Sequence, residues 1–341
     1  MNVNELQDLI VASYKAKRPV LALGSPGVGK SASVYAAAAK LGEGFGVIEL
    51  RAATANPIDL AAIKYVVDGK VRDAEQEWLP TNEKVNKKLC NSAGLIFLDE
   101  ITDGTMSAQS ALQRLLLDRK LGGLTLADGW HTVAASNRAA DKAAAGRLST
   151  ALINRCITVD VKPDTKIFGD WAIDKGLSPT VIGYARWRGN AIWNFDPRTK
   201  AENPAFCSPR SLHILSDMLE AMPQPSLELI TACVGDGIGS EIYGFSKLMN
   251  ELPDLDAVCE GRNVPAPTAT DVSIATIYAL IGRFNEKTAQ HIIAFLSKFE
   301  GELAIMGMTD LIRKDVTLVV KQPAYLPWAV NPVIQKLLLG C

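Results

Sequence analysis

Short apolar runs alternate with stretches of helical spacing in the first half of the chain. Helical spacing predicts an N-terminal helix opened by a capping box of Asn4 and Gln7, an alanine-rich helix ending near Lys40, and a helix over Met106–Leu117. The apolar runs predict five strands: Val20–Leu23, Val47–Leu50, Leu95–Leu98, His131–Ala135 and Ile157–Val161. Such alternation favours an α/β fold, with a parallel sheet covered by helices on both faces.

The alternation stops near Pro163. Beyond it the apolar spacing is mostly helical and is interrupted by three proline-rich stretches, Asn203–Pro209, Met222–Pro225 and Pro265–Pro267. A chain of 341 residues is too long for one compact α/β unit. We therefore predict two or three domains, the first of which carries the sheet.

Two hairpins are predicted within the α/β part. Asp68-Gly69 lies between β-branched residues in Lys64–Val71, which is a strong signal for a two-residue turn. The second hairpin lies in Leu121–Trp130, just before a predicted strand. Taken by themselves, both hairpins could be surface decoration.

A glycine-rich segment connects the first strand to the alanine-rich helix. Its residues fit the pattern G-x-x-x-x-G-K-[ST] and are Gly24, Ser25, Pro26, Gly27, Val28, Gly29, Lys30 and Ser31. Glycines let the backbone curl so that successive N–H groups point at phosphate oxygens, and the following helix adds its positive dipole end. Lys30 would reach the β- and γ-phosphates, and the Ser31 hydroxyl would ligate Mg²⁺.

A pair of acids follows the apolar strand Leu95–Leu98. Asp99 is placed to hold the Mg²⁺ hydration shell, and Glu100 to orient and deprotonate an attacking water. Two acids that end a strand are common at the start of a loop. Together with the phosphate loop, however, they predict Mg²⁺-dependent hydrolysis of a nucleoside triphosphate.

With these two motifs the sequence resembles the AAA+ ATPases, and further residues fall in that family's order. The resemblance implies that Asn137, after strand His131–Ala135, contacts the γ-phosphate or the attacking water. It implies that Arg155, just before the fifth strand, is an arginine finger that reaches a neighbouring subunit's nucleotide. Arg147 could be the finger instead. Arg210, within Ser208–Leu212, matches the sensor of the lid domain.

The resemblance also sets the expected domains, partners and branch. It implies a nucleotide-binding domain over residues 1–163, a helical lid over 164–250, and a helical region of unknown role over 251–341. The hairpins, the finger segment and the segment Ser208–Leu212 resemble the MoxR-like branch, whose ring-forming members use such hairpins to handle a substrate. Tyr65 is accordingly either a packed hairpin residue or a side chain that grips a substrate. That branch implies a hexameric ring, ATP as the nucleotide, a protein client, and a partner protein with a von Willebrand factor A domain.

The composition indicates which partners and which cellular compartment to expect. Lys and Arg total 36 against 37 Asp and Glu, a net charge of −1, which gives no electrostatic reason to expect a nucleic-acid or membrane partner. Six scattered cysteines, without a CxxC pair, favour reduced thiols over a zinc site or disulfides. The N-terminus lacks a signal-peptide pattern and no apolar run reaches membrane-spanning length, so we expect the cytoplasm.

One segment points to a different partner. Basic and aromatic residues interleave in Tyr184–Arg188, then at Trp193, Phe195 and Arg198, as on a surface that binds single-stranded nucleic acid. The alternative is that the aromatics form the lid core and the arginines its solvated edge. Three functions remain open: an ATPase that remodels a protein client, a nucleic-acid motor or restriction-type subunit, and a nucleotide-gated scaffold with little turnover.

Overall fold

The computed structural model describes residues 1–55, 60, 64–74, 76–138, 150–196, 204–222, 224–248 and 251–339. The chain folds into two compact units. The first is formed by Met1–Pro163, and the second begins at Asp164. Among the described residues, no helix combines the length and the apolar character that crossing a bilayer requires.

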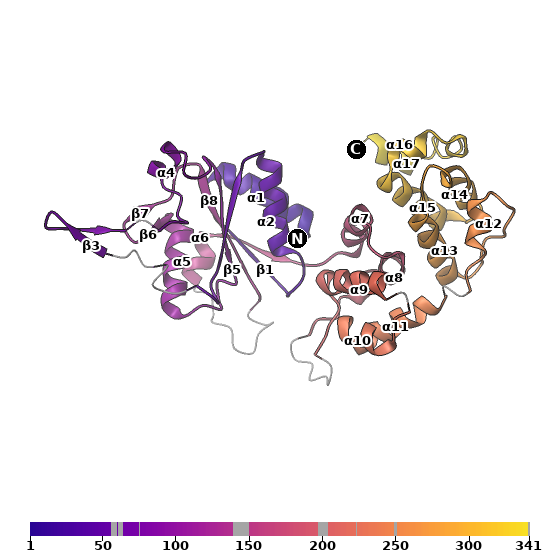
Figure 1. Cartoon of the computed structure of the whole chain (residues 1–341), viewed down its shortest axis with the longest axis horizontal. Coiled ribbons are helices and arrows are strands. Elements are labelled where there is room, and N and C mark those ends of the chain that lie inside the picture. Colours follow the sequence, from indigo (N-terminus) through magenta and orange to yellow (C-terminus); the bar gives the residue numbers. More distant parts are fainter. Residues whose placement is uncertain are drawn as a thin grey trace. The chain divides into compact units, whose positions relative to one another are not determined.

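The first unit is built on a five-stranded sheet (Figure 1). Its strands lie in the order β2-β5-β8-β1-β9, and every neighbouring pair is parallel. The strands are β1 (Val20–Gly24), β2 (Gly46–Arg51), β5 (Gly94–Asp99), β8 (Trp130–Ser136) and β9 (Ile157–Val161). The predicted parallel α/β sheet is confirmed.

Alternate side chains of each strand enter two separate cores. In β5, Leu95 and Phe97 pack on one face of the sheet with residues of α1 (Val3–Ala16) and α2 (Lys30–Leu41). Ile96 and Leu98 pack on the other face with α5 (Met106–Asp118). Because both faces are covered, the strand is apolar throughout, as the sequence predicts. Two further helices complete the unit: α4 (Asn82–Asn86) and α6 (Thr150–Arg155).

The capping box of the first helix differs from the prediction. Asn2, not Asn4, is the cap: its side chain accepts the Glu5 N–H at 2.9 Å, and the Glu5 carboxylate accepts the Asn2 N–H at 2.9 Å. Asn4 already lies in the first helical turn, whereas Asn2 has the extended backbone that an N-cap needs. The correction moves the start of the helix by two residues and leaves its buried face unchanged.

Both predicted hairpins are present. The first pairs β3 (Lys64–Val67) with β4 (Lys70–Asp73) through a turn in which Asp68 and Gly69 have φ of 51° and 70°. It projects from the body of the unit in Figure 1. The second pairs β6 (Lys120–Leu121) with β7 (Leu124–Thr125). The Asp73 carboxylate joins the two hairpins by accepting the Gly123 N–H at 2.7 Å.

The second unit is helical throughout its described residues. Its core is one continuous cluster that runs from Phe168 to Ile334 and therefore crosses the boundary predicted near residue 250. The separation of a lid from a C-terminal region stays a prediction. The helices are α7 (Thr165–Lys175), α8 (Pro179–Arg188), η2 (Gly189–Ile192), α9 (Pro209–Ala221), α10 (Leu227–Val234), α11 (Asp236–Lys247), α12 (Leu255–Cys259), α13 (Thr270–Gly282), α14 (Ala289–Leu296), α15 (Gly301–Lys314), α16 (Val316–Val320), η4 (Pro323–Tyr325) and α17 (Pro332–Leu339).

The basic and aromatic side chains of Tyr184–Arg188 are used inside this unit. Tyr184 is fully buried, and Trp187 stacks on Phe245 with 5.6 Å between the ring centroids. Arg186 is buried against carboxylates, and Arg188 pairs with Glu241 at 2.7 Å. These side chains form the core and edge of the helical unit. Arg198, the last member of the predicted nucleic-acid surface, lies outside the described residues.

Candidate functional site

The glycine-rich loop lies where the carboxyl end of β1 meets the first turn of α2. Gly27 and Gly29 have φ of 77° and 98°, which residues other than glycine rarely adopt. Gly24 is required for a different reason, because a Cβ there would lie 2.6 Å from the Val161 carbonyl oxygen. Glycine therefore allows the loop to curl tightly and to pass close to β9.

Lys30 is almost fully buried at the start of α2. Its Nζ donates to the carbonyl oxygens of Gly24 (2.7 Å) and Ser25 (3.0 Å) and to Asn137 Oδ1 (3.1 Å). The structure thus places the predicted phosphate-binding lysine beside the predicted sensor asparagine, although 107 residues separate them in the chain.

The two predicted magnesium ligands also lie together. Ser31 Oγ donates to Asp99 Oδ2 at 3.2 Å, and Asp99 Oδ1 accepts the Glu100 N–H at 3.0 Å. A hydroxyl and a carboxylate oxygen at this spacing suit Mg²⁺, which prefers oxygen ligands and commonly uses one or two protein groups plus substrate phosphates. Glu100 is partly exposed and has φ of 51°, so a non-glycine residue is held in the left-handed region at this site.

The order of the strands explains why these groups meet. Lys30 follows β1, Asn137 follows β8, and Asp99 and Glu100 end β5. Strand β8 lies between β1 and β5, and all three run parallel. Their carboxyl ends therefore share one edge of the sheet, where open α/β sheets bind ligands.

The structure adds a pair of hydroxyl groups that sequence reasoning missed. Thr102 and Ser136 lie 2.6 Å apart, oxygen to oxygen, in a buried position. The pair joins the turn after Glu100 to the end of β8, and the Ile101 N–H reinforces it by donating to the Ala135 carbonyl at 3.2 Å. It fixes the spacing between Glu100 and Asn137. The sequence offered one clue to this pair: Thr102 is two positions after Glu100, and Ser136 directly precedes Asn137.

Arg51 is a second residue that sequence reasoning missed. It ends β2, and its Cα partner across the sheet is Asp99. Its Nε donates to Glu49 at 2.7 Å, and Glu49 also accepts from the Tyr35 hydroxyl at 2.6 Å. The hydrogen bond to Glu49 raises the pKa of Arg51, with smaller contributions from Asp99 and Glu100. Arg51 therefore lies in the field of both acids, which only the pairing of the strands reveals.

Arg155 does not join this cluster. It is exposed at the end of α6, just before β9, whereas the far end of β9 lies beside Gly24. Five strand residues at roughly 3.3 Å each put about 16 Å between Arg155 and the phosphate loop of its own chain. An arginine side chain cannot span that gap. Arg155 therefore does not belong to the group of side chains around its own phosphate loop.

The remaining arginines predicted for the site are placed as follows. Arg210 is exposed in the first turn of α9, between the capping residues Ser208 and Ser211, and it belongs to the second unit. Arg147 lies outside the described residues. Next to Asn137, Arg138 donates to Asp160 at 2.5 Å and to the Val161 carbonyl at 3.3 Å, which ties the end of β8 to β9.

The glycine-rich loop, the lysine and the carboxylates thus meet at one edge of this sheet, which is the arrangement that a P-loop nucleotide site requires. No family model matches the sequence, and a search of curated proteins found no match. Structural similarity is broad but low. NtrX from Brucella abortus is 15% identical with a TM-score of 0.40, over 98% of this chain and 67% of that chain. It has also been solved with ADP.

Two other solved structures show the same level of likeness. RuvB from Thermotoga maritima is 14% identical with a TM-score of 0.39, over 71% of this chain and 68% of that chain. A protein from Cytophaga hutchinsonii described as an ATPase is 12% identical with a TM-score of 0.33, over 90% and 80% of the two chains.

Proposed function

We propose that this protein is a Mg²⁺-dependent ATPase of AAA+ type that forms a ring and remodels, activates or assembles a protein client. The observation that carries the proposal is the meeting of Lys30, Asn137 and the Ser31–Asp99 pair at one sheet edge, with Glu100 adjoining. Phosphoryl transfer needs positioning and compensation of negative charge more than covalent chemistry. A cation, a polar sensor, metal ligands and a base are the groups that such catalysis requires.

Each residue has a distinct role in this proposal. Lys30 binds the β- and γ-phosphates, and Ser31 and Asp99 hold the metal. The bound Mg²⁺ would neutralise charge on the phosphate oxygens. Glu100 accepts a proton from the attacking water, and Asn137, already bonded to Lys30, contacts the γ-phosphate or that water. The choice of ATP over GTP rests on the family resemblance alone.

The ring and the client follow from the resemblance and from two exposed features. Arg155 lies too far from its own loop to serve it, which suits a finger donated to a neighbouring copy. The β3–β4 hairpin carries the exposed apolar side chains of Tyr65, Val66 and Val71, which suit contact with a protein client. We propose a hexamer of MoxR-like type and a partner with a von Willebrand factor A domain. The Arg210 sensor role belongs to the same proposal.

Two variants test the ATPase assignment. Lys30→Ala should weaken ATP binding by at least about tenfold, since a hydrogen bond to a charged group is worth ~1.5–3 kcal/mol. Glu100→Gln should keep binding and lose about 10²–10⁴-fold in turnover, because a general base acts mainly once water attacks. Binding is measured by calorimetry and turnover by steady-state phosphate release. Glu83→Gln, a change to an exposed acid on α4, serves as the matched control.

The same measurements separate the alternatives. Normal turnover in Glu100→Gln would remove the assigned base and with it this mechanism. A wild-type protein that binds ATP tightly but releases no phosphate, with or without a client, would instead be a nucleotide-gated scaffold. Turnover stimulated strongly by DNA or RNA would identify a nucleic-acid motor.

A further inference from the structure

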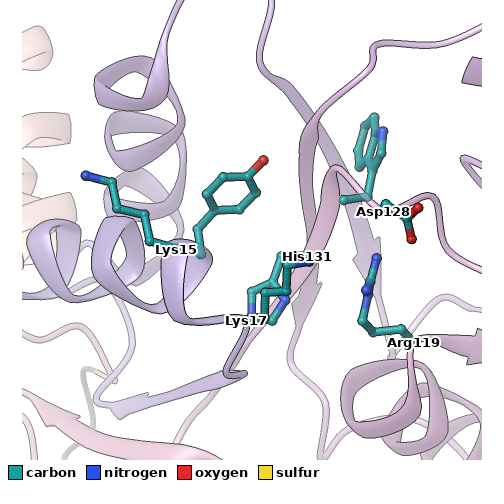
Figure 2. Close-up of a pocket in the computed structure, with 7 residues that line it drawn as sticks. Lys15, Lys17, Arg119, Asp128 and His131 are labelled. Carbon is teal, nitrogen blue, oxygen red and sulfur yellow. The ribbon is translucent and has the colours of Figure 1, made fainter.

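A pocket lined by charged and aromatic residues lies in the first unit, at the other end of the sheet from the phosphate loop. Its cavity has a volume of about 160 Å³ and is shown in Figure 2. Trp130 and His131 open β8 at this pocket, whereas Asn137 follows the opposite end of the same strand. The lining residues are Tyr14, Lys15, Lys17, Arg119, Asp128, Trp130 and His131. The length of β8 therefore separates the pocket from the candidate nucleotide site.

The lining has an excess of positive charge. Lys15, Lys17 and Arg119 are cations, against the single carboxylate of Asp128. Asp128 is held by Asn82, whose side-chain oxygen accepts the Asp128 N–H at 3.1 Å and whose side-chain nitrogen lies 3.5 Å from Oδ2. The lining thus has a net charge of +2 when His131 is neutral.

Two of these cations occupy positions that favour glycine. Lys17 ends α1 with φ of 53°, and Arg119 ends α5 with φ of 55°. In the second unit, helices α7, α8 and α10 are followed by glycine residues at positive φ, namely Gly176, Gly189 and Gly235. Lys88, just after α4, has a similar φ of 57°, so a left-handed lysine is not confined to this pocket. What distinguishes Lys17 and Arg119 is that both line the same cavity.

Arg119 has unused hydrogen-bonding capacity. One terminal nitrogen donates to the Ala127 carbonyl at 2.7 Å, but Nε is buried and has no hydrogen-bond partner among the described residues. A buried donor without a partner is costly unless a ligand or water satisfies it. The polar atoms of the two aromatic side chains are already satisfied, since Tyr14 donates to the Gly129 carbonyl and Trp130 to the Asn91 carbonyl. Figure 2 shows the Lys15 ammonium directed away from the other lining residues, so the Arg119 guanidinium and the Lys17 ammonium are the donors that a ligand would meet.

The pKa of His131 depends on the charges that line this pocket. Its Nε2 lies 2.8 Å from the Arg18 carbonyl, so that nitrogen carries the proton. Burial lowers the pKa of His131, the bond to Arg18 opposes this, and the positive charges of Arg119 and Lys17 lower it further. An anion bound among these cations would offset their charge and raise the pKa of His131.

We propose that this pocket binds the phosphate group of a small phosphorylated ligand. A guanidinium group matches the geometry of phosphate oxygens, the Lys17 ammonium group adds a point charge, and the Tyr14 and Trp130 rings form apolar walls. A simpler explanation is that Lys17 and Arg119 only complement the negative ends of helices α1 and α5. The two explanations differ in what happens when either cation is replaced by glycine.

The test uses the full-length chain and inorganic phosphate as the probe. The chain has three histidines, so the ring signal of His131 can be assigned by comparison with His131→Gln and followed by NMR through a pH titration. Phosphate should raise the pKa of His131, and sodium chloride of equal ionic strength should not. The Lys30→Ala variant should give the same response, because that lysine serves the nucleotide site at the other end of β8.

Lys17→Gly and Arg119→Gly should each weaken phosphate binding at least tenfold. Both should keep their fold and melting temperature close to that of the parent, because glycine favours the left-handed C-cap. Unchanged phosphate affinity in both variants, or no shift of His131 in the parent, would overturn the proposal. Acetate that raises the pKa of His131 as effectively as phosphate would also overturn it and would indicate a carboxylate ligand instead.

Discussion

Two regions of the molecule concentrate charged side chains, and they use the charges in opposite ways. In the second unit, Arg186 is 11% exposed and pairs with Asp170 at 2.7 Å and with Asp310 at 2.9 Å. The Tyr278 hydroxyl donates to the other oxygen of Asp310 at 2.5 Å. Burial alone would lower the pKa of Arg186, but Asp310, Tyr278 and Asp170 outweigh it and raise the pKa. The charges are neutralised within the protein.

At the sheet edge of the first unit the acids are arranged differently. Asp99 and Glu100 are partly exposed, and Glu100 is held at a positive φ. The Ser31–Asp99 contact is at the long end of hydrogen-bond distances, whereas the contacts of Arg186 are short. The comparison teaches that closed, matched charges stabilise a fold, while accessible and strained ones are arranged for a ligand. A variant in one of these regions should leave the other region unchanged.

The largest effect is expected from the arginine finger. Arg155→Ala should lose about 10³-fold or more in turnover, because a finger compensates charge in the transition state. Its own loop, Asp99 and Glu100 remain intact, whereas Glu100→Gln has a dead site and an intact finger. Mixed in equal amounts, the two inactive variants should regain activity at about a quarter of the boundaries between subunits. Phosphate release before and after mixing measures this.

The mixing experiment has a clear negative outcome. A finger that acts within its own chain predicts no recovery, so zero recovery with subunit exchange shown independently would refute the trans role. Repeating the mixture with Arg147→Ala decides between the two candidates. Neither Arg155→Ala nor Glu100→Gln should lower the unfolding free energy of the second unit, because both residues lie in the first unit, outside the ionic network of the second.

Removal of Asp310 should give the next largest effect, and on stability instead of turnover. Asp310→Ala leaves Arg186 buried with half of its partners and should lower the unfolding free energy of the second unit by about 3–5 kcal/mol. Denaturant unfolding followed by tryptophan fluorescence measures it. The matched control is Glu260→Ala, which breaks an exposed pair with Arg262 and should leave the midpoint almost unchanged. Equal losses of unfolding free energy in the two variants would mean that the buried network stabilises the second unit no more than an exposed ion pair does.

A smaller effect is expected from backbone strain at the nucleotide site. Glu100→Gly should raise the unfolding free energy of the first unit by about 0.5–1 kcal/mol, because glycine adopts positive φ without steric cost. Glu100→Gln keeps the strain and should melt like the parent, while both variants lose turnover. A Glu100→Gly protein that is less stable than Glu100→Gln would show that the left-handed conformation stores no strain there.

The smallest effect should come from nucleic acid. DNA and RNA should leave phosphate release unchanged at physiological salt, because the chain has a net charge of −1 and its Tyr184–Arg188 segment is used within the second unit. A protein client or partner should stimulate release instead. Strong stimulation by either nucleic acid, falling steeply with added salt, would move the motor hypothesis ahead of the remodelling one.

Much of the first unit could be predicted from local patterns. The five strands, both hairpins and the turn at Asp68-Gly69 follow from apolar runs and turn chemistry, which depend on neighbouring residues only. The glycine-rich loop is equally local, because its conformation is set by residues that are adjacent in the chain. The cap of the first helix was misplaced by two residues, since Asn2 and Asn4 have the same chemistry and only the backbone distinguishes them.

The sequence by itself therefore determined the strands, the phosphate loop and the acids that follow β5. Only the tertiary structure placed β8 between β1 and β5, which brings Asn137 to Lys30, and only it paired Thr102 with Ser136 and Arg51 with Asp99. It also decided that Arg186 is buried against Asp310, 124 residues away. The physical reason is that propensity and turn chemistry act between neighbours, whereas strand order and the matching of buried charges depend on contacts between distant segments.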